Sequence, residues 1–392
     1  MYCIKCGTEI KPGQKFCTNC GTPAPSSPNQ RESDQQETDE DRGASQTTTD
    51  QKENAKNVES YDAHTIVDTL NQYVGGSKEH VSLNWKVLFK DVFKSHSPEE
   101  AEEIFACGSP TTTPDPQNVT SNWPHPWLYS RVFFGFVIAF FILKICAETF
   151  ENEKVLPGLM VIGSFAAPFA LVVMFMELNV FKNISFYYVM KTFLIGGCAS
   201  LLLTMILYSF VVPTDNDMTY AVAFGVSIAE ELGKALIVLF FLKRITKTHS
   251  ILIGLLVGAS VGAGFAAFES AGYAFDTMLI GSRWEDFIGI IYLRGFLAPG
   301  GHVAWAAISG VAIVLANRSE QISINVLGEM RFWKLFIIPI ICHWLWDSPI
   351  EWGSDYYLVQ LILCVVIWIF VLLLVNMGLK EVDEDTPATV QQ

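Results

Sequence analysis

Ionisable side chains inside long apolar segments constrain the fold of this chain more than any other feature. Seven of them lie in four such segments: Glu230, Glu231, Lys234, Glu269, His302, His343 and Asp347. A charged side chain at the centre of a bilayer costs about 2.5–3.5 kcal/mol even on a lenient insertion scale, so such groups face one another or water. The sequence therefore predicts a polar site assembled inside a membrane from several helices.

The composition fits a membrane protein and excludes a nucleic-acid binder. Of the 392 residues, 51% are hydrophobic and only 17% are charged, whereas soluble domains carry about 25% charged residues. The net charge of −14 comes mainly from the acidic segment 29–59 and the tail 381–392. No basic stripe is present, which argues against binding of nucleic acid. We also expect no signal peptide, because a cysteine motif follows Met1 directly.

Four cysteines near the start of the chain predict a zinc ribbon over residues 1–22. Cys3, Cys6, Cys17 and Cys20 form two Cys-x2-Cys pairs, each followed by glycine. Four thiolates form a closed tetrahedral site, so we expect a structural zinc and no chemistry there. Two disulfides are the alternative, which the expected cytoplasmic placement disfavours. The ribbon could also serve as a docking surface for a cytoplasmic protein partner.

The remaining boundaries follow from changes in composition. Residues 23–57 are acidic and nearly free of aliphatic side chains, so we expect a disordered linker. Residues 58–122 predict a cytoplasmic helical segment with one short helix over 83–93. A second short helix should begin after Ser97, because Pro98 and Glu100 resemble a capping box. The membrane domain covers 123–380, and an acidic tail covers 381–392.

Apolar segments of about 20 residues, the length that crosses a bilayer, predict an all-α polytopic membrane protein with about eight transmembrane helices. Residues 279–297 are expected to form an outer loop. Gly254, Gly258 and Gly262 predict close packing of the fifth span against a partner helix. The predicted spans are 132–150, 159–177, 192–212, 219–242, 250–278, 298–316, 333–350 and 355–377.

Basic residues at alternate ends of these spans predict the orientation. By the positive-inside rule both termini lie in the cytoplasm, and the outer loop 279–297 is the exception. Glu269 then lies about 28 Å into its span, so the site falls in the outer half of the bilayer. The basic residues that set this orientation are Arg131, Lys182, Lys191, Lys243, Arg244, Lys247, Arg318, Arg331, Lys334 and Lys380.

Each member of the polar set also has a purely structural interpretation. Glu230 and Lys234 are four residues apart and could form an ion pair that only joins helices. Asp347 could simply accept a hydrogen bond from His343. Glu269 could join two helices, and His302 could cap the helix that it begins. A net negative charge remains after pairing, because the two adjacent carboxylates share one cation. This excess charge favours a functional interpretation over a purely structural one.

Four short motifs, in order along the chain, resemble those of the PrsW family of intramembrane proteases. They are EELGK, FAAFE, GGHVAW and HWLWD, and the resemblance covers residues of about 130–380. It implies a bacterial multi-pass protein of the plasma membrane that cuts a membrane-anchored substrate, such as an anti-sigma factor, near the extracytoplasmic face. The short PrsW proteins lack a zinc ribbon, so the amino-terminal part is a departure from the family.

Roles follow for the residues of these motifs. We expect Glu230 and Glu231 to polarise the water, with Lys234 tuning their charge, and Glu269 to complete the proton shuttle. We expect His302 and His343 to stabilise the oxyanion, and Asp347 to fix the tautomer of His343.

Metal use and function class stay open on the sequence alone. No HExxH helix is present, so we favour a metal-independent glutamate mechanism and expect any catalytic divalent metal to use His302 and His343. A proton-coupled transporter is the main alternative, because proton relays also use intramembrane carboxylates and histidines. A non-catalytic membrane sensor that signals through the ribbon is another.

Overall fold

The computed structural model of the protein describes residues 66–211, 217–245, 250–281, 283–317 and 322–385. All of them belong to one compact unit, Tyr61–Gln392. The predicted ribbon with its four cysteines and the linker 23–57 lie outside the described residues. Every regular element that the structure describes is helical, which confirms the all-α class.

All eight predicted spans are helical. Six segments of the described chain are long and apolar enough to cross a membrane, as expected of a multi-pass membrane protein. Helices α7 and α11 are not among these six, and each carries three charged side chains. The helices at the predicted spans are α3 (Leu128–Phe150), α4 (Leu156–Leu178), α5 (Phe186–Lys191) with α6 (Gly197–Val211), α7 (Tyr220–Leu242), α8 (Ile251–Leu279), α10 (His302–Ala316), α11 (Met330–Asp347) and α12 (Leu358–Asp385).

The prediction of an outer loop over 279–297 is wrong, because most of this segment forms helix α9 (Trp284–Leu297). Apolar residues recur along this segment at helical spacing and give α9 one buried face. Phe287 and Ile291 are 2% and 5% exposed and pack in a small cluster with Phe140 of α3. A 3₁₀ turn then leads directly into α10, so the charged side chains of α9 lie beside the membrane helices.

Small residues bring α8 and α10 into close contact. A Cβ atom built on Gly258 would lie 2.1 Å from the carbonyl oxygen of Ala306, and one on Gly262 would lie 2.2 Å from that of His302. The glycine stripe therefore packs as predicted, with α10 as the partner. Because the two backbones touch at His302, the helix start that carries this histidine is fixed against α8.

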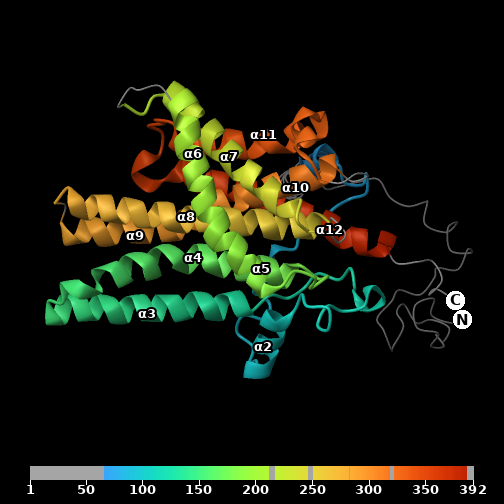
Figure 1. The fold of residues 1–392 in the computed structure, drawn as a ribbon, viewed down its shortest axis with the longest axis horizontal. Helices are drawn as coiled ribbons and strands as arrows, with labels where there is room; N and C mark the ends of the chain where they lie inside the picture. Colours follow the sequence, from blue (N-terminus) through green and yellow to red (C-terminus); the bar gives the residue numbers. More distant parts are fainter. Residues whose placement is uncertain (1–65, 212–216, 246–249, 282, 318–321, 386–392) are drawn as a thin grey trace, which may run out of the picture. The chain divides into compact units, whose positions relative to one another are not determined.

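Helix α4 packs against α3, α8 and α9, and these four helices run side by side (Figure 1). Helix α6 crosses α8 and packs against α7 and α8. At this crossing a Cβ atom on Gly197 would lie 2.6 Å from the backbone of Gly264, so both positions need glycine. The crossing places the far half of α6 beside the polar residues of α7.

The segment before α3 contains one 3₁₀ turn and one short helix that concern the predictions made above. The predicted helix over 83–93 is only a 3₁₀ turn, Trp85–Phe89. Helix α2 (Pro98–Ala106) begins as predicted, with the Ser97 side chain accepting a hydrogen bond from the backbone of Glu100 at 3.2 Å. The Tyr129 hydroxyl donates to the carbonyl of Leu88 at 3.0 Å and ties this segment to α3.

Candidate active site

The fold brings all seven predicted residues into one connected cluster. Glu230, Glu231 and Lys234 come from α7, and Glu269 comes from α8. His302 is the first residue of α10, while His343 and Asp347 lie in the last two turns of α11. Successive ion pairs and hydrogen bonds connect the whole set.

Lys234 and Glu231 form the inner part of the cluster, and both side chains are 0% exposed. The Lys234 ammonium lies 2.6 Å from Glu231 Oε1 but 3.9 Å from Glu230 Oε2. The sequence singled out the pair with Glu230, whereas the closer partner is Glu231. Two buried opposite charges at this distance neutralise each other, which leaves Glu230 without a close cation.

The protonation of the His302 ring follows from its neighbours. The Lys234 ammonium lies 2.8 Å from His302 Nδ1, and lysine can only donate. His302 Nδ1 therefore accepts, and the ring proton sits on Nε2, which lies 2.9 Å from Glu269 Oε2. Glu269 thus holds His302 in the tautomer whose Nδ1 lone pair is directed into the cluster.

His343 has a carboxylate at each ring nitrogen. Nδ1 lies 2.8 Å from Glu231 Oε1, and Nε2 lies 3.0 Å from Asp347 Oδ2. A neutral imidazole donates from one nitrogen only, so the two carboxylates compete for one proton. The ring stacks on Trp305 with centroids 4.4 Å apart, and this contact fixes its plane.

Two residues of the site were not predicted, Arg294 of α9 and Tyr208 of α6. Arg294 forms an ion pair with Glu269, and the Tyr208 hydroxyl donates to Glu230 Oε1. One sequence feature could have identified Arg294, because it is a single arginine in the otherwise apolar segment 287–297. The sequence predicts a loop there, whereas the segment is part of helix α9. Tyr208 carried none, because a tyrosine near the end of an apolar helix is typical of a membrane interface.

A cavity of about 650 Å³ divides the predicted residues into two groups. Five line it: Glu230, Glu269, His302, His343 and Asp347. Glu231 and Lys234 are not among its lining residues, so they act on the site from behind its wall. Met218 and Tyr357, near the starts of α7 and α12, also line the cavity, which therefore reaches that end of the helices.

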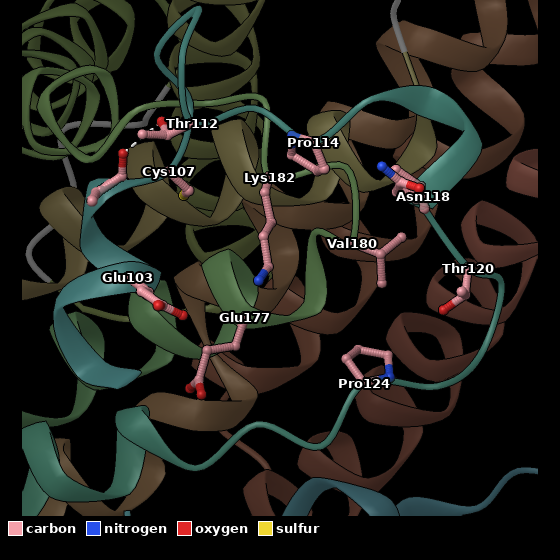
Figure 2. A pocket seen from close by; sticks show the side chains of 12 residues that line it. Glu103, Cys107, Thr112, Pro114, Asn118, Thr120, Pro124, Glu177, Val180 and Lys182 are labelled. Atoms are coloured by element: carbon pink, nitrogen blue, oxygen red, sulfur yellow. Dashed lines mark hydrogen bonds between the residues drawn. The ribbon is translucent and has the colours of Figure 1, made fainter. Parts of the chain in front are cut away.

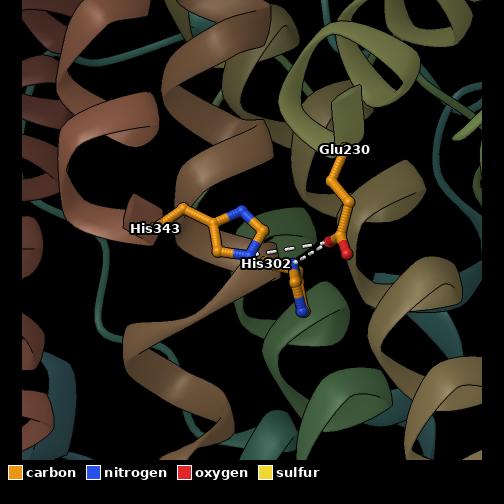
Figure 3. Close-up of side chains that lie close together, drawn as sticks. All are labelled: Glu230, His302 and His343. Atoms are coloured by element: carbon orange, nitrogen blue, oxygen red, sulfur yellow. Dashed lines mark ion pairs between the residues drawn. The ribbon is translucent and has the colours of Figure 1, made fainter. Parts of the chain in front are cut away.

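Glu230, His302 and His343 point toward one another at the cavity wall (Figure 3). Glu230 Oε2 lies 3.8 Å from His302 Nδ1 and 3.7 Å from His343 Nε2. Among the described residues this buried oxygen has no hydrogen-bond partner. Glu231 Oε2 is also without one, but that side chain does not line the cavity.

Family comparison identifies the domain that carries this site. Residues 185–375 match the family described as PrsW family intramembrane metalloprotease. They are a PrsW protease domain. The match contains all seven predicted residues, Tyr208 and Arg294, whereas α3 and α4 precede it. Residues 2–24 match a zinc-ribbon domain, which confirms the prediction for residues 1–22. Neither the curated proteins nor the solved structures gave a match to the chain.

The donor set of the PrsW domain fits a catalytic metal, as the word metalloprotease in the family description implies. One carboxylate and two imidazoles are the three protein ligands of many catalytic zinc sites. Two ligands of a tetrahedral zinc lie about 3.3 Å apart, given bonds of about 2.0–2.1 Å. The three donor atoms here lie within 4.8 Å of one another, a slightly wider arrangement.

The charge balance of the PrsW domain also favours a bound cation. The connected cluster holds four carboxylates, Glu230, Glu231, Glu269 and Asp347, against the cations Lys234 and Arg294. With neutral histidines its net charge would be −2, and with His343 protonated between Glu231 and Asp347 it would be −1. An uncompensated negative charge is costly in a site of low dielectric, and a bound cation would offset it.

A second cavity, of about 470 Å³, lies between α2, the segment that follows it and the loop after α4 (Figure 2). The Glu177 carboxylate at its wall accepts hydrogen bonds from the backbone N–H groups of Trp127, Leu128 and Tyr129 at 2.8, 2.9 and 3.0 Å. It thereby caps the start of α3. Cys107 also lines this cavity, and burial raises the pKa of its thiol.

Proposed function

We propose that the protein hydrolyses peptide bonds of membrane-anchored proteins near the extracytoplasmic face of a bacterial plasma membrane. The observation that carries the proposal is the unpartnered Glu230 oxygen facing His302 and His343 at the wall of a cavity among membrane helices. The family supplies the reaction, an intramembrane proteolysis. The resemblance favours an anti-sigma factor as the substrate.

The extracytoplasmic side is supported by the distribution of basic residues. Lys243 and Arg244 follow the end of α7, whereas the cavity reaches the opposite end, near Met218. By the positive-inside rule the basic end is cytoplasmic. The same rule places both termini in the cytoplasm, where the ribbon could bind a protein partner and where its thiolates would stay reduced.

Glu230, His302 and His343 are the residues that would hold a catalytic divalent ion. When bound, such an ion acts as a Lewis acid that polarises a carbonyl group and acidifies water. This replaces the metal-independent mechanism favoured on the sequence alone, because the family description names a metalloprotease and the donor set fits one. Zinc is the natural candidate for this set of ligands.

Two carboxylates orient the histidines. If the His343 proton is on Nδ1, Glu231 accepts it and Nε2, which lies 3.0 Å from Asp347 and 3.7 Å from Glu230, is left to bind a metal. Lys234 neutralises the Glu231 carboxylate. Glu269 accepts from His302 Nε2 and leaves Nδ1, 3.8 Å from Glu230 Oε2, without a proton. This nitrogen accepts from Lys234 in the structure, and a metal bond at Nδ1 would take the place of that hydrogen bond. Such outer carboxylates fix the tautomer and the ring orientation of ligating histidines. Glu231 is thus a positioning residue, not a group that contacts the water.

Asp347 is the best placed group to exchange a proton with the attacking water. It lines the cavity, its side chain is 27% exposed, and it pairs with His343 at 3.0 Å. Glu269, which we expected to be the proton shuttle, is 18% exposed and engaged by both Arg294 and His302. We therefore exchange the two roles, so that Asp347 carries the proton and Glu269 fixes a histidine.

The decisive experiment separates a protease from a transporter. The purified full chain in detergent is incubated with single-span membrane proteins, and new termini are mapped by mass spectrometry. We expect cleavage near the extracytoplasmic end of the span. Proton flux in liposomes with no cleavage of any substrate would select the transporter instead.

The proposed side can be tested separately with the two ends of α7. Cysteine introduced at Asp217 should react with an impermeant thiol reagent added to intact cells, and cysteine at Lys243 should not. The unmodified chain provides the background from the native cysteines. The reverse pattern would place the cavity on the cytoplasmic side.

A further inference from the structure

Arg294 reaches the site from a helix that none of the predicted residues occupies. Its guanidinium forms an ion pair with Glu269, and its Nε donates to the Ser270 hydroxyl at 2.8 Å. The same group lies 4.2 Å from the ring centroid of Tyr273. Three contacts to successive turns of α8 hold this side chain, which is 23% exposed and lines the cavity, in one orientation.

The contact between Arg294 and Glu269 continues to a histidine. Glu269 Oε2, the oxygen paired with Arg294, is also the oxygen that lies 2.9 Å from His302 Nε2. A carboxylate that accepts from an imidazole N–H sets both the tautomer and the tilt of the ring. If the guanidinium were removed, this carboxylate could rotate away and its charge would lack a cation.

The position of Arg294 is set by packing outside the matched family region. Ile291, one turn earlier on α9, is buried with Phe140 of α3. At the start of α9 the Trp284 indole N–H donates to Glu148 of α3 at 2.8 Å. Contacts at Trp284 and at Ile291 thus fix α9 against α3, and this packing sets the position of Arg294 at the site.

We propose that Arg294 is a positioning residue that acts through Glu269 to orient His302. The proposal rests on the function proposed above for His302. Arginine suits this role because its planar fork can serve a carboxylate and a hydroxyl at once and can stack on an aromatic ring. Lysine would supply only the charge.

A double-mutant cycle tests the proposal. Arg294→Gln, Glu269→Gln and the double variant are compared in kcat and KM on one membrane-anchored substrate. We expect Arg294→Gln to lower kcat by about 10- to 100-fold with little change in KM. The double variant should be no slower than Glu269→Gln, because both changes interrupt one path. Losses that multiply in the double variant would overturn the proposal.

Arg283→Gln is the matched control, since Arg283 precedes the same helix, is 77% exposed and pairs with Asp286 on the surface. It should leave kcat unchanged. Arg294→Lys keeps the charge without the fork and should fall between wild type and Arg294→Gln. This variant decides the question if the glutamine variant does not fold. If Arg294→Lys had the kcat of wild type, the planar guanidinium group would not be required, and only the charge would matter.

Zinc titration provides a readout that does not depend on cleavage. Beyond the ion of the ribbon, the second zinc should bind Arg294→Gln about 10- to 100-fold more weakly than wild type. Unchanged zinc affinity would break the link between Arg294 and His302. If the wild-type protein cleaves no substrate, the proposed function fails, and the titration still decides whether Arg294 orients the histidine.

Discussion

Glu177 and Glu230 line the two cavities described above, but the two carboxylates differ in their hydrogen bonds. Glu177 in the cavity beside α2 accepts three backbone hydrogen bonds. Glu230 in the cavity among the membrane helices accepts one, from Tyr208, and its second oxygen has no hydrogen-bond partner among the described residues. The protein backbone satisfies the hydrogen bonds of Glu177, whereas Glu230 Oε2 remains available to a ligand such as a metal ion.

This difference separates structural from functional carboxylates better than burial does. A buried polar group without a partner costs about 1–3 kcal/mol, so a protein keeps one only where it serves another purpose. Glu177 completes the backbone hydrogen bonding of a helix start, as caps do elsewhere. The comparison predicts that changes at Glu230 reduce activity without reducing stability, and that changes at Glu177 do the reverse.

Glu230→Gln should have the largest effect on activity. The substitution keeps the shape but removes the charge, so we expect cleavage to fall by about 100- to 10,000-fold. Because no hydrogen bond to Glu230 Oε2 is lost, thermal stability in detergent should stay close to that of wild type. Cleavage at the wild-type rate would remove Glu230 from the site.

Glu231→Gln should reduce cleavage by about 10- to 100-fold, as expected of a partner that orients a histidine from behind the wall. It should also lower stability, because Lys234 would remain as a buried cation without its closest partner. Kinetics and thermal unfolding on the same preparation check both effects. A loss as large as that of Glu230→Gln with unchanged stability would place Glu231 at the cavity wall.

Glu177→Gln should leave kcat unchanged and lower stability by about 1–3 kcal/mol, because an amide offers one acceptor oxygen to three N–H groups. Glu103→Gln is the control, since Glu103 lines the same cavity but is exposed. Thermal unfolding of both variants measures the difference. Lost activity in a fully stable Glu177→Gln would give this cavity a role in catalysis.

Cys107 should show the smallest effect of all. Burial raises its pKa, so the thiolate fraction at neutral pH is smaller than for an exposed thiol. A maleimide reagent at pH 7 should leave Cys107 unmodified in the folded protein and modify it after denaturation. Peptide mass spectrometry reads out both states. Modification of the folded protein would show that the cavity beside α2 opens.

The sequence predicted the all-α fold but not helix α9, and the structure brings the seven candidate residues, whose roles stay predictions, into one cluster. Glu230, Glu269, His302 and His343 stand out because charges in apolar segments are rare, and rarity alone identifies them. The sequence does not single out Arg294 in the same way, because α9 has 14 residues with three charges among them, a composition that also fits a loop. The sequence could not show that Glu230 Oε2 lacks a hydrogen-bond partner, because this depends on the distances between side chains of four helices. Residue spacing along the chain does not determine those distances.

The central claim, that Glu230, His302 and His343 hold a divalent metal in an intramembrane protease, is tested most directly by counting metal. The full chain in detergent should contain two divalent ions per molecule. A variant with serine at Cys3, Cys6, Cys17 and Cys20 should contain one and still cleave, and adding alanine at Glu230, His302 and His343 should remove it. A ribbon variant that contains no divalent metal and cleaves at the wild-type rate would contradict the account.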